Sequence, residues 1–245
     1  MATHTNSGGD YGRKFTIARE NGQADKNGRP YFFEWIKQIP ADPGKRKFET
    51  RKSGNGEDRF YELFSALDGF LISVEKSMQT FGGTKKEEAW LKIVLTDAGE
   101  EYQIEIGRLD GRYSMDFLKR LLDPNFDPNY KLRLAPLSSE PKGDSKGGMF
   151  LSTYSGVNKL EAGWQMKHLE GMPQGEKFEI PGKDTIWSFT KAAEWLYDQV
   201  QIRVVPKLMK DPISAPVKRQ EPAGTGFPTV APTEPETNDS DDLPF

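Results

Sequence analysis

Residues 239–245, at the end of the sequence, combine side chains that suit the recognition of another protein. Three carboxylates stand beside two apolar side chains, Leu243 and Phe245. Carboxylates form strong charge-assisted hydrogen bonds with Lys and Arg, and the apolar side chains of a peptide fill pockets on a partner. No Lys or Arg occurs from Gln220 onward, whereas six of the 37 acidic residues lie there. The pattern therefore predicts an acidic peptide ligand joined to a mildly basic body.

The sequence ends in Asp-Asp-Leu-Pro-Phe, which closely resembles the acidic tip of bacterial and bacteriophage single-stranded DNA-binding proteins. The resemblance is confined to residues 239–245. It implies that the folded body binds single-stranded DNA and that the tip recruits replication, recombination or repair proteins. It also implies that the tip competes with DNA for the body. The partner-binding residues would be Asp239, Asp241, Asp242, Leu243, Pro244 and Phe245.

A second group of residues could bind the nucleic acid itself. Single-strand binding requires cations along the phosphates and aromatic rings on which bases stack. Residues 45–52 (KRKFETRK) contain five basic residues and one acid, and the alternation over residues 89–96 places Trp90 and Lys92 opposite an apolar face. The candidate DNA-binding residues are Trp35, Lys37, Lys45, Arg46, Lys47, Phe48, Arg51, Lys52, Lys85, Lys86, Trp90, Lys92, Lys142, Lys146 and Tyr154.

Several of these candidates also have a purely structural interpretation. Aromatic residues in strands are more often core than stacking surfaces, and we favour a core position for Phe32, Phe33 and Trp35. Trp90 fits either role. The basic stretch 45–52 could equally be an ordinary edge strand that its lysines protect from aggregation.

Hydrophobic periodicity gives the order of the elements that must position these residues. Alternation predicts strands over residues 13–20, 30–39, 45–52, 69–81, 89–96, 100–109, 130–137 and 149–155, and a short strand over 201–205. Helical spacing predicts helices over residues 114–122 and 188–200, with Ser114 and Ser188 as N-caps. Residues 59–67 fit either a strand or a helical turn.

From residue 69 the order is long strand, strand, strand, helix, strand, strand, which is typical of the OB-fold, a barrel that binds oligonucleotides. We predict a mainly β protein with a few helices, built as an OB-like five-stranded barrel with a core of about residues 67–156. An N-terminal β-hairpin region elaborates it. This body would span residues 12–205, after a flexible N-terminus over 1–11. Residues 206–245 hold eight of the 17 prolines and predict a disordered linker ending in the tip.

Composition argues against several other classes of protein. The chain has no Cys and only two His, which removes disulfides, thiolate nucleophiles and Cys- or His-based zinc sites. No phosphate-binding glycine loop of the Gly-x4-Gly-Lys-Ser/Thr type occurs. We therefore predict no catalytic residue, no metal and no cofactor. The sequence shows no apolar run of membrane-spanning length and no secretory signal pattern, so a cytoplasmic location is expected, in the host cell if a bacteriophage encodes the protein.

The prediction is a non-enzymatic protein that coats single-stranded DNA without strong sequence preference and recruits partners through its tip. A body with two β-rich halves looks more like a bacteriophage member of the family than a bacterial one. Two alternatives stay open. A recombination mediator or annealing protein could carry the same tip, and, less in keeping with the sequence, a metal-dependent nuclease could hide its carboxylates among the many present.

Overall fold

A computed structural model describes residues 13–17, 30–53, 55–80, 87–139, 148–160, 169–179 and 186–208. All of them belong to one unit of the chain, Met1–Ile213. The strands are β1 (Arg13–Ile17), β2 (Phe32–Ile36), β3 (Lys47–Lys52), β4 (Asp58–Phe64), β5 (Leu67–Thr80), β6 (Glu87–Asp97), β7 (Glu100–Arg108), β8 (Leu132–Ser139), β9 (Gly148–Ser155), β10 (Asn158–Lys159), β11 (Glu176–Phe178) and β12 (Ile186–Ser188). The helices are α1 (Arg112–Leu121), α2 (Thr190–Arg203) and a 3-10 turn, η1 (Val205–Lys207). The prediction of a mainly β fold is confirmed.

One sheet holds ten of these strands in the order β10-β9-β8-β5-β6-β7-β1-β2-β4-β3, and β11 and β12 form a separate hairpin. The strands β5, β6 and β7 are consecutive antiparallel neighbours, and β8 returns to pair with β5. This spatial order, fourth-first-second-third, is that of a Greek key. The helix α1 lies between β7 and β8 in the chain, so the predicted order of elements from residue 69 is confirmed.

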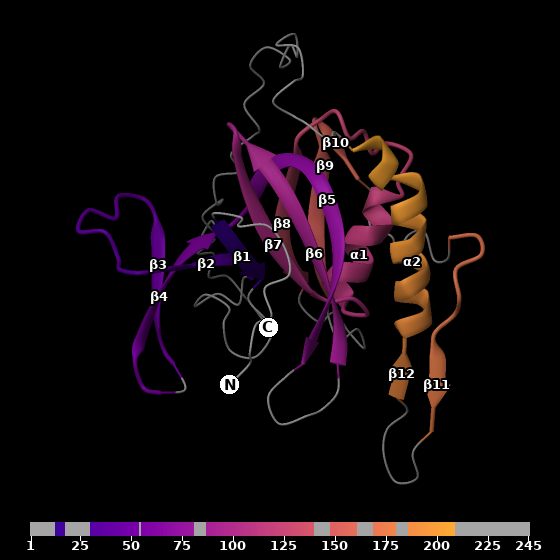
Figure 1. Ribbon diagram of the computed structural model, residues 1–245, viewed down its shortest axis with the longest axis horizontal. Coiled ribbons are helices and arrows are strands. Elements are labelled where there is room, and N and C mark those ends of the chain that lie inside the picture. The colour runs from indigo at the N-terminus through magenta and orange to yellow at the C-terminus, as the bar shows by residue number, and fades with distance from the viewer. Residues whose placement is uncertain are drawn as a thin grey trace, which may run out of the picture. The chain divides into compact units, whose positions relative to one another are not determined.

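The outer edge of β7 is occupied by β1, which pairs with it in parallel and then pairs with β2 in antiparallel fashion. Among the described residues β7 does not pair with β9, the contact that would close a five-stranded barrel. The sheet therefore continues sideways from β7 into β1, β2, β4 and β3. Figure 1 shows both helices on the side of β5 to β9, and β3 and β4 at the other end of the sheet.

The longest strand, β5, pairs with β8 over its first residues and with β6 over the others, and it changes direction between these two segments. A bulge lies between Leu71 and Ser73. Figure 1 shows β5 as a strongly curved strand. At the start of this curve Gly69 packs against the Tyr102 hydroxyl, which donates a hydrogen bond to the carbonyl of Asp68. Burial raises the pKa of Tyr102, and the nearby carboxylates Asp97 and Asp68 raise it further, so the hydroxyl stays a donor.

A buried ion pair within α1 also bonds the backbone of β9. Arg120 is fully buried, and its Nε donates to Asp116 Oδ2 at 2.9 Å. The same Asp116 oxygen accepts the backbone N–H of Leu151 on β9 at 2.9 Å. A buried charge is stable only when it is paired in this way. The buried ion pair therefore sets how α1 lies against β9.

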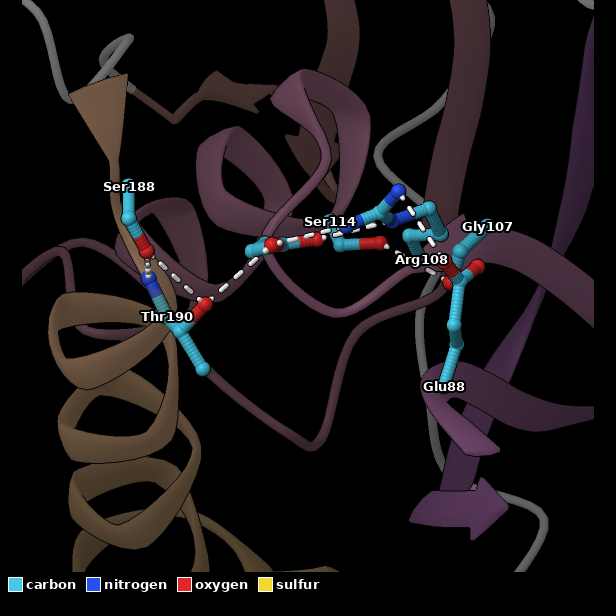
Figure 2. Close-up of polar contacts among 7 residues, drawn as sticks. Glu88, Gly107, Arg108, Ser114, Ser188 and Thr190 are labelled. Carbon is cyan, nitrogen blue, oxygen red and sulfur yellow. Dashed lines mark hydrogen bonds and ion pairs between the residues drawn. The ribbon is translucent and has the colours of Figure 1, made fainter. Parts of the chain in front are cut away.

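A chain of exposed polar contacts fixes the start of α2 (Figure 2). Arg108 at the end of β7 bonds Glu88 of β6 at 3.2 Å and Asp110 at 3.1 Å. Asp110 accepts the Thr190 hydroxyl at 3.4 Å, and the Thr190 and Ser188 hydroxyls are 3.1 Å apart. The first turn of α2 is thus held to the connection between β7 and α1.

Several local predictions need correction. The helix α1 begins at Arg112, so Ser114 is not its N-cap; its hydroxyl bonds the carbonyl of Gly107 instead (Figure 2). Ser188 lies in β12, and Phe189 is the N-cap of α2. The strand predicted over 201–205 is helical, because α2 continues its packing past Val200 and the Gln201 side chain bonds the carbonyl of Val74 on β5. Residues 59–67, which were left open, are largely β4.

None of the described helices is long and apolar enough to cross a membrane.

The close approach at Gly69 predicts that Gly69→Ala destabilises the fold. An added Cβ would lie 2.7 Å from the Tyr102 hydroxyl, 3.0 Å from Leu95 Cβ and 3.1 Å from the Thr96 carbonyl oxygen. Overpacking of this kind lowers the free energy of unfolding by about 1–3 kcal/mol. Urea denaturation measures the loss. The control is Thr80→Ala at the exposed end of the same strand, for which a change within about 0.5 kcal/mol is expected. Equal stability of the two variants would contradict the packing described.

Candidate nucleic-acid interface

The three strands β2, β4 and β3 form a part of the sheet with two different faces. On one face Phe32 is completely buried, and the neighbouring Phe64 packs against Phe15. The other face carries Trp35 of β2 directly opposite Tyr61 of β4. The core position favoured for Trp35 is wrong, because its side chain is 58% exposed although aromatic residues in strands are usually buried. We call this second side the pocket face.

An arginine stacks between two rings on the pocket face. The Arg51 guanidinium of β3 lies 4.9 Å from the Phe33 ring centroid and 5.0 Å from that of Tyr61. The two rings meet edge to face, with centroids 5.3 Å apart. Glu49 holds the same guanidinium at 2.8 Å. Stacking and pairing together fix Tyr61 in place beside Trp35.

Trp35 and Tyr61 line an open pocket of about 440 Å³ at the end of these strands. Two cations, Lys37 and Arg59, line the same pocket, and within the described residues neither has a carboxylate partner. The remaining lining residues are Ile36, Glu57, Asp58 and Phe60. An aromatic surface beside unpaired cations is the arrangement that single-stranded nucleic acid requires.

The carboxylates near the pocket reduce its positive charge only in part. Asp58 pairs with Lys52 at 2.7 Å, so its charge is already balanced by a residue of β3. Glu57 also lines the pocket, in the turn that leads into β4. The pocket therefore keeps two cations against one unpaired carboxylate.

The basic stretch 45–52 is largely neutralised by its own surroundings. Arg46 pairs with Glu62, which is only 5% exposed, and its guanidinium stacks 5.2 Å from the Phe48 ring. The hydrogen bond to Glu62 raises the pKa of Arg46, and the charge of Glu62 adds to this. Arg51 and Lys52 are paired as described above. Arg46 is therefore a structural residue on the side opposite the pocket face.

The remaining cations of this stretch are more accessible. Lys45 and Lys47 are exposed, and Lys47 Nζ lies 3.3 Å from the Tyr31 hydroxyl and 5.3 Å from the Tyr31 ring centroid. Within the described residues neither lysine forms an ion pair with a carboxylate. Lys47 lies on the pocket face, because it is spaced by two and four residues from Glu49 and Arg51 and side chains with this spacing in a strand share a face.

Of the two roles that the sequence allows for Trp90, the structure supports the core position and not the stacking surface. The Trp90 side chain is 3% exposed, because β6 is a central strand and Trp90 lies between Ser77 of β5 and Arg108 of β7. Lys92 on the same face lies opposite Glu75 on one side and Glu105 on the other. This part of the sheet therefore offers no excess of positive charge.

The other predicted residues fall into two groups. Tyr154 is half-buried on β9, opposite Lys159 of β10 and far in the strand order from Trp35. The remaining candidates lie outside the described residues: Lys85, Lys86, Lys142, Lys146, Asp239, Asp241, Asp242, Leu243, Pro244 and Phe245.

The sequence did not single out Tyr61, Arg59 or Phe33 as members of this interface. Tyr61 and Arg59 fall in the stretch whose conformation was left open, so no face could be assigned to them. Phe33 was assigned to the core, but it supports Arg51 on the pocket face. The available signal was alternation, which can be applied once β4 is known to be a strand. It places Arg59, Tyr61 and Leu63 on one face and Phe60, Glu62 and Phe64 on the other.

No group of three or more His, Asp and Glu side chains within the described ranges is placed to hold a metal ion. Comparisons of this chain with protein-family models, curated proteins and solved structures gave no match.

Proposed function

We propose that this protein binds single-stranded DNA without strong sequence preference, and that the pocket face of β2, β4 and β3 is its principal contact. The observation that carries the proposal is the exposed Trp35 beside Tyr61, with Lys37 and Arg59 in the same pocket. A large exposed aromatic surface flanked by unpaired cations matches the two needs of an unpaired polynucleotide, base stacking and phosphate neutralisation.

In the proposed mechanism a base stacks on Trp35, whose side chain is more than half exposed. Tyr61 supplies a second ring, held rigid by the Arg51 stack. Lys37 and Arg59 bind the phosphates on either side, and counterions leave the DNA as they do so. Such contacts read no base edges, which accounts for sequence tolerance.

We also propose that β5, β6, β7, β8 and β9 form a partly open, OB-like barrel that supports this surface, with β1 rather than β9 on the outer edge of β7. The Greek-key order of β5 to β8 favours it. In OB-folds the oligonucleotide usually lies on the second and third strands, here β6 and β7. On these strands Trp90 is buried and Lys92 lies opposite Glu75 and Glu105, so we place the main contact on the sideways extension instead.

The acidic tip completes the proposal as a recruiting peptide. Its carboxylates and its apolar pair Leu243 and Phe245 suit a basic-rimmed pocket on a replication, recombination or repair protein. The resemblance of the last seven residues to single-stranded DNA-binding proteins supports this role.

The stacking role of Trp35 predicts that Trp35→Ala weakens binding of a fluorescent oligo-dT, measured by anisotropy. Loss of one base stack costs about 1–3 kcal/mol, or roughly 5-fold to 150-fold in the dissociation constant. Trp187→Ala is a matched control, because Trp187 is also in a strand and similarly exposed, at 54%. Equal losses of affinity in the two variants would contradict the assignment of DNA binding to the pocket face.

The phosphate-binding role of Lys37 and Arg59 predicts a shallower salt dependence in the variant Lys37→Gln/Arg59→Gln. Each lost contact with a single strand reduces the slope of log K against log salt concentration by about 0.7. The control is Lys177→Gln/Lys191→Gln, which removes the same charge from two lysines already paired with Glu179 and Glu176. If both variants shift the slope alike, net charge rather than the pocket determines binding.

The recruiting role of the tip predicts that deletion of residues 239–245 leaves oligo-dT binding intact or tighter, because a competing acidic segment is removed. Deletion of residues 226–232 is the control of equal length, since these seven residues carry no charge. Titration at low and high salt measures both. A large loss of DNA affinity on removal of the tip would contradict the recruiting role of the tip. The DNA-binding role of the pocket face is tested separately by the Trp35 and Lys37/Arg59 variants.

A further inference from the structure

Among the described residues, one edge of the strand β3 has no strand paired with it. This strand is the last in the order of the sheet, and it pairs with β4. Its middle residue, Thr50, is exposed. An open edge presents a row of N–H and C=O groups that a further strand can complete.

Symmetry restricts how a second copy of β3 could pair with this edge. A two-fold axis normal to the sheet makes the two strands antiparallel and keeps each face on the same side. Directly opposite residues point to the same face, so their numbers in the two identical strands differ by an even number. One residue of β3 must therefore lie at the centre of the pair, opposite the same residue of the second copy. The two registers that use most of the strand are centred on Glu49 and on Thr50.

Charge distinguishes these two registers. Centred on Glu49, the pairing places Glu49 against Glu49 and Lys47 against Arg51 twice, so every charged pair is repulsive. Centred on Thr50, it places Glu49 of each copy against Arg51 of the other, and Phe48 against the aliphatic stem of Lys52. Opposite charges directly across antiparallel strands stabilise the pair, and like charges destabilise it.

We propose that two copies of this chain pair through their β3 edges, antiparallel and centred on Thr50. Within one copy Glu49 and Arg51 lie on the pocket face and meet at 2.8 Å, while the Arg51 guanidinium also stacks on Phe33 and Tyr61. In the pair Glu49 of each copy lies directly across the strand edge from the positively charged Arg51 of the other copy. The interface goes beyond DNA binding and does not depend on it.

The pairing has a geometric consequence for the pocket face. The two-fold axis normal to the sheet leaves both pocket faces on the same side, so two Trp35 sites face one ligand. Linked sites on one polymer bind it more tightly than either site alone.

A cysteine cross-link tests the register directly, because the chain contains no Cys. Opposite residues of antiparallel strands have Cα atoms about 4.5–5.5 Å apart, within the range that a disulfide spans. Thr50→Cys should therefore form a covalent dimer under mild oxidation. Lys52→Cys is the control on the same exposed strand. In the proposed register the residues at position 52 of the two copies lie about 13 Å apart along the strands, too far for a disulfide.

Light scattering on the full chain, at the protein concentration of the cross-linking experiment, tests the charge pairing. Glu49→Lys should halve the mass from dimer to monomer, and Glu49→Lys/Arg51→Glu should restore the dimer. Circular dichroism confirms that each variant is folded. A monomeric wild-type chain, or equal cross-linking by Thr50→Cys and Lys52→Cys, would overturn the proposal. Neither outcome decides whether the pocket face itself binds oligo-dT, which the Trp35 and Lys37/Arg59 variants test separately.

Discussion

The pairing of β1 with β7 is the constraint on which the rest of the structure depends. In the described part of the chain, the sheet hydrogen bonds between the Greek key and the strands of the pocket face all pass through β1. Phe15 in its centre packs edge to face against Phe64 on one side and Tyr102 on the other. The same strand also occupies the edge of β7, so the sheet extends sideways. The pocket face exists because of that extension.

The part of the fold that was predictable depends on local sequence. Alternation in β5, β6 and β7 and the apolar stripe of α1 are properties of short segments, so the element order followed from periodicity. The β1–β7 pairing joins residues far apart in the sequence, and no local pattern specifies a parallel partner. The predicted end of α2, at residue 200, was wrong for a related reason. The contact of Gln201 with β5 extends the helix beyond the point at which short-range signals would end it.

The candidate site was predictable in composition but not in geometry. Trp35 and Lys37 were identified from residue type, yet whether Trp35 is core or surface depended on which face of β2 is covered. Alternation placed Trp90 correctly relative to Lys92, but it could not show that neighbouring strands cover both. The basic stretch 45–52 illustrates the same limit for charge, since Arg46 is neutralised by Glu62, a residue that lies on another strand.

The shortness of β1 has a mechanical consequence. Five residues join two halves of the sheet, and the half that carries Trp35 has no helix packed on it in Figure 1. Because so few strand hydrogen bonds join them, the two halves also depend on their shared core, in which Phe15 is buried with Phe32 and Tyr102, and a substitution at Phe15 would loosen both halves at once.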